Sequence, residues 1–173
     1  VSKGEYKMND LEFGFGINIV PLVAPVDSAG TAYATPFVDL KNSLKATFLY
    51  YAGVITAASA DQHIVITMEA ATAAASGSEV AIPFTYRLSG ATGANTWGAS
   101  TAATSSGYSL DTTSGDGKAL LIEIDNAGLD TLLADARFVR MVVGINAGGT
   151  VTLNSALAFL QPRFPQVTQL SAT

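Results

Sequence analysis

The chain has 173 residues, enough for one domain of ordinary size, and no cysteine, which excludes disulfides and cysteine-built zinc sites. With a net charge of −5 and nine scattered Lys and Arg residues, it offers no basic patch for nucleic acid or for a membrane surface. Although 49% of the residues are hydrophobic, no apolar run is long enough for a membrane-spanning helix, and the N-terminus lacks the apolar segment of a signal peptide. Such a composition either hides surface against a partner or reflects the many alanines.

The two ends of the chain differ in composition from its centre. Residues 1–16 are polar and mixed in charge, with aromatic residues between them, and we expect an arm that becomes ordered on contact with another molecule. Residues 165–173 are expected to form a tail. Residues 17–164 are expected to form a single β-sandwich domain.

Strand patterns dominate the first half of this central region. Ile17–Val23 contains Pro21, which cannot donate a hydrogen bond to a neighbouring strand, so this strand is expected at a sheet edge or to end early. Leu44–Val54 is also predicted to be a strand. Gln62–Glu69 alternates between apolar and polar residues, as a strand with one buried face does. Its apolar face holds Ile64, Ile66 and Met68.

The same alternation continues further along the chain. Val80–Leu88 is predicted to be one strand, and Ala119–Asp125 another. Their expected apolar faces are Val80, Ile82, Phe84, Tyr86 and Leu88 in the first and Leu120, Ile122 and Ile124 in the second. Between them, Thr92–Lys118 is rich in Gly, Ala, Ser and Thr, and we interpret it as a long excursion within one sandwich, with "NTWG" and "GYSL" as candidate short strands.

The last third of the domain combines one helical pattern with two strands. Asp125–Ala136 spaces three leucines at i, i+3 and i+4 and predicts a short connecting helix, capped by Asp125 or by Asn126. Arg137–Ile145 and Thr150–Phe164 are predicted strands. The "NAGG" segment between them indicates a hairpin, because Asn and Gly tolerate positive φ. Together these elements predict an all-β protein, an antiparallel β-sandwich or jelly roll with one short helix.

No pattern of catalytic residues stands out. The chain has no nucleophile elbow, phosphate-binding loop, zinc-protease motif or dinucleotide fingerprint. His63 is the sole histidine, and an exposed strand position is its ordinary explanation. Four acids, Asp111, Asp116, Glu123 and Asp125, fall close together, but their spacing does not match an EF-hand loop. We therefore expect a non-enzymatic protein without a cofactor or metal.

The ordered segments resemble a known group of proteins. "PVDSAG", "EID" followed by "LD", "RFVRM" and a closing "QPRF" occur in a succession that resembles small tailed-bacteriophage virion proteins of the head-decoration, or cement, type. The resemblance covers roughly Ile17–Phe164. It implies a structural protein that is made in the host cytoplasm and sits on the outer surface of the capsid. Such a protein would bind the major capsid protein and its own copies, as a dimer or trimer.

Candidate contact residues follow from this hypothesis. Capsid or subunit contacts are expected from the arm and from two arginines near strand ends. These residues are Tyr6, Phe13, Phe15, Arg140 and Arg163. The alternative is a tail- or fibre-associated sandwich that binds carbohydrate by aromatic stacking. Its candidate glycan contacts are Asn95, Trp97 and Tyr108.

Overall fold

The computed structural model describes residues 16–27, 31–56, 63–75, 77–110, 115–145 and 150–163. The predicted tail lies outside these residues, and so does the predicted arm apart from Gly16. The elements, in chain order, are β1 (Asn18–Val26), β2 (Tyr33–Ala34), β3 (Val38–Asp39), β4 (Ser43–Tyr51), β5 (Val54–Thr56), β6 (Ile64–Ala71), β7 (Val80–Ile82), β8 (Phe84–Leu88), β9 (Thr101–Ala103), β10 (Tyr108–Leu110), β11 (Ala119–Asp125), α2 (Asn126–Leu132), β12 (Phe138–Ile145), β13 (Thr150–Thr152) and β14 (Asn154–Pro162).

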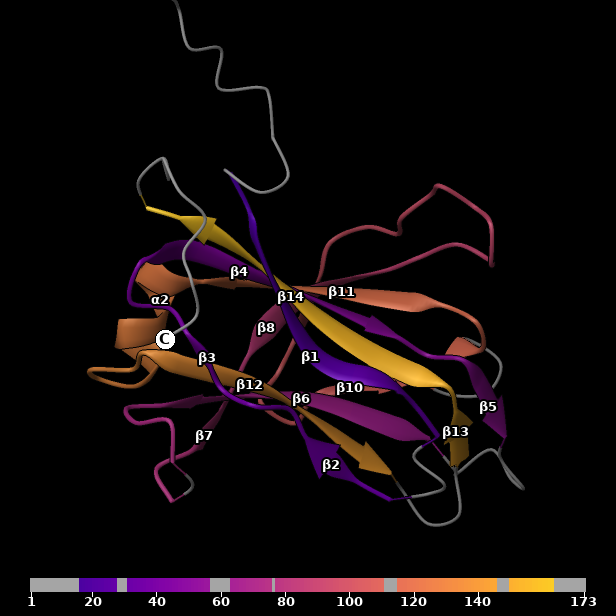
Figure 1. Ribbon diagram of the computed structural model, residues 1–173, viewed down its shortest axis with the longest axis horizontal. Helices are drawn as coiled ribbons and strands as arrows, with labels where there is room; N and C mark the ends of the chain where they lie inside the picture. Colours follow the sequence, from indigo (N-terminus) through magenta and orange to yellow (C-terminus); the bar gives the residue numbers. More distant parts are fainter. Residues whose placement is uncertain are drawn as a thin grey trace, which may run out of the picture.

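Two antiparallel sheets form a sandwich, as the strand patterns predict (Figure 1). The first sheet has the order β1-β14-β4-β11-β8-β9. In the second sheet, β6 and β12 pair along their whole length. Two short strands, β10 and β7, pair with β6, and two others, β2 and β3, pair with β12. A separate ribbon of β5 and β13 completes the architecture.

The core lies between the two sheets and uses the alternating positions that the sequence indicates. Every second residue of β4, β11, β6 and β12 is buried, because successive side chains of a strand point to opposite faces. The predicted apolar faces of β6 and β11 are thereby confirmed. The largest fully buried side chains include Phe48, Tyr50, Leu120 and Ile122 from the first sheet and Ile64, Ile66, Met68 and Met141 from the second.

The prediction of one continuous strand over Val80–Leu88 is wrong. The structure divides it at Pro83 into β7, which pairs with β6, and β8, which pairs with β11 in the other sheet. Proline has no N–H to donate and commonly ends a strand, so the chain changes sheets there. Ile82 and Phe84, on either side of the break, are both buried, whereas Val80 at the start of β7 is 44% exposed.

The predicted hairpin through the "NAGG" segment is also wrong. Residues 146–149 lie outside the described part of the chain, but β12 belongs to the second sheet whereas β13 pairs with β5. The predicted strand Thr150–Phe164 is interrupted at Leu153, whose φ of 56° is in the left-handed region. Only the part after Leu153 joins the first sheet, between β1 and β4.

The Gly-, Ala-, Ser- and Thr-rich excursion of residues 92–118 is part of the sandwich. It carries β9, which ends the first sheet, and β10, which lies in the second. "GYSL" contains β10, as expected, while Trp97 forms an isolated bridge with Ser89 rather than a strand. The ring centroids of Tyr108 on β10 and Tyr86 on β8 lie 4.1 Å apart, so aromatic packing joins the two sheets here.

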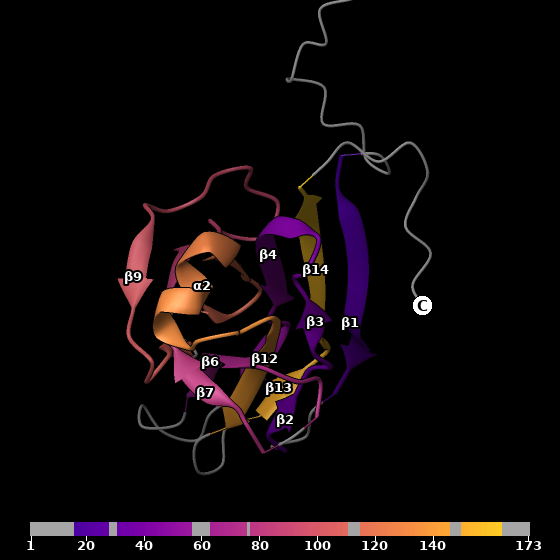
Figure 2. The ribbon, with the colours of Figure 1, turned by 90° about the vertical axis from the view of Figure 1, so that its left-hand side faces the viewer.

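The connecting helix α2 follows β11 and covers one end of the sandwich (Figure 2). Asp125 is its N-cap, because its Oδ1 accepts a hydrogen bond from the backbone N–H of Ala127 at 3.0 Å. Leu129 is buried, whereas Leu132 is exposed. In the described parts of the chain, no helix has the length and apolar character needed to cross a membrane.

Candidate functional site: the outer face of the first sheet

A row of apolar side chains crosses the outer face of the first sheet. In register across the strands β1, β14, β4, β11 and β8 lie Pro21, Leu157, Leu49, Leu121 and Arg87. Directly opposed residues of antiparallel strands have Cβ atoms about 5 Å apart, so these side chains are neighbours. The row is therefore continuous from the edge strand β1 to β11.

Three further apolar side chains extend this row. Ile19 is opposite Phe159, and Tyr51 flanks Leu49 two residues along β4. Ile19 is 43% exposed and Tyr51 40% exposed, whereas the leucines and Phe159 are half-buried. We call the whole set the outer apolar face: Ile19, Pro21, Leu49, Tyr51, Leu121, Leu157 and Phe159. A contiguous apolar surface of this kind is typical of an interaction site.

The charged groups on this side of the sheet include one ion pair. The Nζ of Lys45 lies 2.5 Å from Oε1 of Glu123, and both side chains are about one-third exposed. Arg87, at the end of the apolar row, makes a long hydrogen bond of 3.4 Å to the carbonyl oxygen of Gly98. Asp125, on the same side of β11 as Leu121 and Glu123, forms no salt bridge with a described residue, and neither does Arg87.

The strand edges, in contrast, are poorly suited to pairing with another chain. On the edge strand β1, Pro21 lacks an N–H, and its pairing with β14 is interrupted by register shifts between Pro21 and Val23 and between Val23 and Val26. The opposite edge, β9, has three residues, and the edge strands of the second sheet have two or three each. Short, bulged and proline-containing edges disfavour association by strand addition. A partner is thus better accommodated on a sheet face.

The outer side of the second sheet carries an ion-pair network beside half-buried apolar side chains such as Phe138 and Val142. Arg140 on β12 is opposite Glu69 on β6, with Nε and Oε2 2.7 Å apart, and its other nitrogen Nη2 lies 2.9 Å from Oε1 of Glu79. Its guanidinium carbon lies 4.6 Å from the ring centroid of Phe37. The side chain is 19% exposed. Arg140, a predicted contact residue, therefore forms its ion pairs with residues of its own chain.

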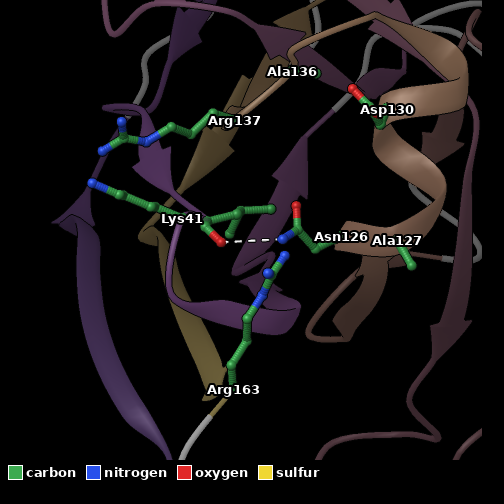
Figure 3. Close-up of a pocket in the computed structure, with 8 residues that line it drawn as sticks. Lys41, Asn126, Ala127, Asp130, Ala136, Arg137 and Arg163 are labelled. Carbon is green, nitrogen blue, oxygen red and sulfur yellow. Dashed lines mark hydrogen bonds between the residues drawn. The ribbon is translucent and has the colours of Figure 1, made fainter.

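Arg163, the other predicted contact arginine, lines a hollow beside α2. The cavity has a volume of about 350 Å³, and Figure 3 shows the side chain of Arg163 extending toward that of Asn126. Its lining residues are Leu40, Lys41, Asn126, Ala127, Asp130, Ala136, Arg137 and Arg163. Asn126 is committed to structure, since its side-chain amide donates to the carbonyl oxygens of Leu40 and Ser43 at 3.2 and 3.0 Å.

The hollow has an excess of positive charge in an otherwise acidic protein. Arg137 is neutralised by Asp39, whose carboxylate accepts from Nε at 2.6 Å and also from Nη2. This pairing holds the pKa of the Asp39 carboxyl below its usual range. Lys41 and Arg163 form no salt bridge with any residue that the structure describes, and Asp130 is the lining carboxylate. The hollow can therefore attract an acidic group.

The predicted glycan contacts occupy different environments. Asn95 and Trp97 are exposed in the segment between β8 and β9, and Trp97 is 44% exposed. Tyr108 is half-buried on β10 and packs on Tyr86 and the core. Exposed Trp97 is the part of this set that is accessible for stacking on a sugar ring. The predicted arm contacts Tyr6, Phe13 and Phe15 lie outside the described residues.

The acids that hint at a calcium loop each have a separate structural role, except Asp111, which lies outside the described residues. Asp116 accepts a hydrogen bond from the backbone N–H of Ile55 at 2.8 Å. Glu123 pairs with Lys45, and Asp125 caps α2. His63 is half-buried just before β6. Among the described residues, no group of three or more His, Asp or Glu side chains is arranged to hold a metal ion.

A buried polar cluster joins the two sheets near β2. The hydroxyl of Tyr33 donates to Oδ1 of the fully buried Asn154, and Nδ2 of Asn154 donates to the carbonyl oxygen of Val26 at 3.1 Å. Burial raises the pKa of Tyr33 to about 12, against a smaller lowering by the neighbouring Tyr50 hydroxyl. The buried Tyr50 hydroxyl makes no well-formed hydrogen bond with any described residue. The cluster supports the fold rather than a surface site.

Sequence reasoning missed the outer apolar face, although a signal for it exists. β4 contains the run Phe48, Leu49, Tyr50 and Tyr51, and β11 contains Leu120, Leu121 and Ile122. Apolar residues on both faces of a strand, at odd and even positions alike, are typical of strands that are covered on both sides. Phe48 and Tyr50 of β4, like Leu120 and Ile122 of β11, point into the core, and the apolar residues between them point outward.

Comparison of the chain with protein-family models, with curated proteins and with solved structures finds no match. The resemblance to head-decoration proteins therefore stays a prediction. The surfaces of the chain itself are the basis for proposing its function.

Proposed function

We propose that this protein is a structural component of a tailed-bacteriophage virion, which coats the outer head surface and stabilises the capsid by binding the major capsid protein. The observation that carries the proposal is the outer apolar face of the first sheet. A sheet surface of this composition is suited to packing against protein, because its outward side chains are mostly apolar rather than the convergent polar groups of a small-molecule site.

The arrangement of charge and edges supports the same proposal. A protein present in many copies must attach through defined contacts, without strand pairing that continues from copy to copy. The short, bulged and proline-containing edge strands meet that requirement. Many modest contacts, repeated over a shell, add up to a large total stabilisation. The hollow at Lys41 and Arg163 supplies a second surface, of cationic character, that suits an acidic region of the shell.

A second candidate function is supported by the exposure of Trp97. In that alternative the protein belongs to the tail or its fibres and binds carbohydrate, with an aromatic ring stacked on a sugar. The supporting observation is weaker, because Tyr108 is packed into the molecule whereas Asn95 and Trp97 are exposed.

The test is the copy number of the chain in purified particles, measured by quantitative mass spectrometry against the most abundant shell protein. A ratio near one, or a simple fraction of it, is the expected result for a protein that covers the head. A few copies per particle, together with glycan binding that is lost in Trp97→Ala, would favour the tail-associated alternative. Absence from particles would contradict both virion functions.

A further inference from the structure

We propose that residues 11–15 of the same chain fold back over the outer apolar face in the free protein, so that the capsid protein must displace them to reach this face. The inference rests on the proposed function and adds a regulation of the surface that carries it. The segment, "LEFGF", comes just before the described part of the chain.

The segment is tethered at the border of the outer apolar face. Gly16 lies in a turn, and β1, the edge strand of the first sheet, begins two residues later (Figure 2). Ile19 and Pro21 on β1 already belong to the face. Gly14 and Gly16 flank Phe15 in the sequence, and glycine allows the chain to reverse its direction there. The segment can therefore reach the face without a long linker.

The segment carries apolar side chains at alternate positions. Leu11, Phe13 and Phe15 are separated by Glu12 and Gly14. Alternate side chains of an extended chain point to the same side, so three apolar side chains can lie on one surface together. Aromatic side chains bury a large apolar area and act as anchors in contacts of this kind. The apolar side of the segment therefore matches the apolar side chains of the face.

The size of the face fits a short segment. The strands β1, β14, β4 and β11, about 4.8 Å apart, span about 14 Å, and the rows from Phe159 to Tyr51 extend over about 13 Å along the strands. The resulting area, roughly 200 Å², is well below the roughly 800 Å² that each partner contributes to a standard interface. A second folded protein would need further contacts, whereas five extended residues span about 17 Å and cross the face.

Attachment to the same chain favours the segment over another molecule. A segment held by a short linker is present at an effective concentration on the order of millimolar. A second copy competes only at its concentration in solution, and the net charge of −5 on each chain opposes its approach. The cover in the free protein is therefore supplied by the chain itself.

The charges beside the face also favour this occupant. Arg87 and Asp125 lie on the outer side of the first sheet and form no salt bridge with a described residue. The arm carries Asp10 and Glu12 in and next to the segment, and Lys7 a few residues before it. It thus brings a charge of opposite sign for each of the two groups.

The experiment measures how fast a single cysteine on the face reacts with a thiol reagent in the free protein. The chain has no cysteine, so Thr47→Cys introduces one site, opposite Phe159 on the outer side of the first sheet. Thr67→Cys is the matched control, since Thr67 is also half-buried but lies on the outer side of the second sheet. Phe13→Asp combined with Phe15→Asp should raise the rate at position 47 by about 10-fold or more and leave position 67 unchanged, because the reagent reaches only an uncovered face.

A second arm variant separates apolar contact from charge. Ser2→Asp combined with Asn9→Asp adds the same two negative charges but keeps the apolar side chains, and it should leave both rates unchanged. Circular dichroism establishes that each variant is folded. The rates are measured over a range of protein concentrations, and a cover supplied by the same molecule requires a rate at position 47 that is independent of concentration.

The outcomes separate this inference from the proposed function. An equal rate at position 47 with either arm would overturn the cover, and so would protection that increases with protein concentration, which would identify a second copy as the occupant. The rates are measured without heads. Protection in a chain that is absent from particles would therefore overturn only the virion function, and a chain that is present in particles but shows no protection would overturn only the cover.

Rebinding to stripped heads tests the displacement. The variant with Phe13→Asp and Phe15→Asp should bind more tightly than the variant with Ser2→Asp and Asn9→Asp, by about the factor gained in the labelling rate, because the latter must first uncover its face. Unchanged binding would overturn the displacement. Weaker binding would also overturn it, by showing that these aromatic side chains contact the capsid directly.

Discussion

Among single residues, buried polar groups differ in how well they are satisfied. Asn154 is fully buried and accepts from Tyr33 while donating to Val26, so it links β14 to β2 and β1. The hydroxyl of Tyr50, also fully buried, makes no well-formed hydrogen bond with any described residue, and burial raises its pKa. A buried hydroxyl that makes no well-formed hydrogen bond recovers little of the hydration that it loses on folding.

We predict opposite outcomes for the two tyrosines. Tyr50→Phe should leave the free energy of unfolding unchanged or raise it by up to about 1 kcal/mol, because it removes an unsatisfied hydroxyl. Tyr33→Phe should lower it by about 1–3 kcal/mol, because Oδ1 of Asn154 would lose its donor. Urea unfolding of both variants measures the difference. Equal destabilisation by the two substitutions would contradict this assignment.

At the scale of strands and turns, the points where the chain crosses from one sheet to the other determine the topology of the sandwich. It does so at Pro83 between β7 and β8, and again through the turn between β9 and β10. Gly107 in that turn has a φ of +89°, and a Cβ placed there would lie 2.4 Å from the carbonyl oxygen of Ile66. Glycine is required because both the backbone angle and the close approach to β6 exclude a side chain.

Gly107→Ala should destabilise the protein by about 2 kcal/mol or more, because it combines positive-φ strain with a backbone clash. Gly93→Ala is the matched control, since Gly93 has a φ of +84° but no neighbouring atom within 4 Å of the position that a Cβ would take. It should cost only the backbone strain, about 1 kcal/mol. Thermal and urea unfolding compare the two. A control variant as unstable as Gly107→Ala would show that the contact with β6 is unimportant.

Over the molecule as a whole, the two faces and the helix end have different chemistry. The first sheet is apolar outside, the second carries the Arg140 ion-pair network, and the end beside α2 carries the cationic hollow. The outer apolar face and the cationic hollow are therefore separate surfaces.

The proposed capsid attachment predicts a specific role for Arg163. Arg163→Glu should weaken rebinding to stripped heads, and rebinding of the wild type should decrease with salt, because surface charges are screened over about 8–10 Å at moderate ionic strength. Lys118→Glu makes the same charge change next to the start of β11, the opposite end of that strand from α2. Co-sedimentation with heads measures both variants. Equal loss for the two would indicate an effect of net charge alone.

Local chemistry in the chain is enough to predict its strand character, the buried faces of β6 and β11, an edge position or early end for β1, and a short helix capped by Asp125 or by Asn126. These features depend on the period of two in a strand, the missing N–H of Pro21 and the capping carboxylate. The folded arrangement was needed to establish that Val80–Leu88 is divided between sheets, that β12 and β13 do not pair, and that Arg140 is held by Glu69 and Glu79. It also brings the residues of the outer apolar face together, because strand order and register, which join residues far apart in the sequence, have no local signal.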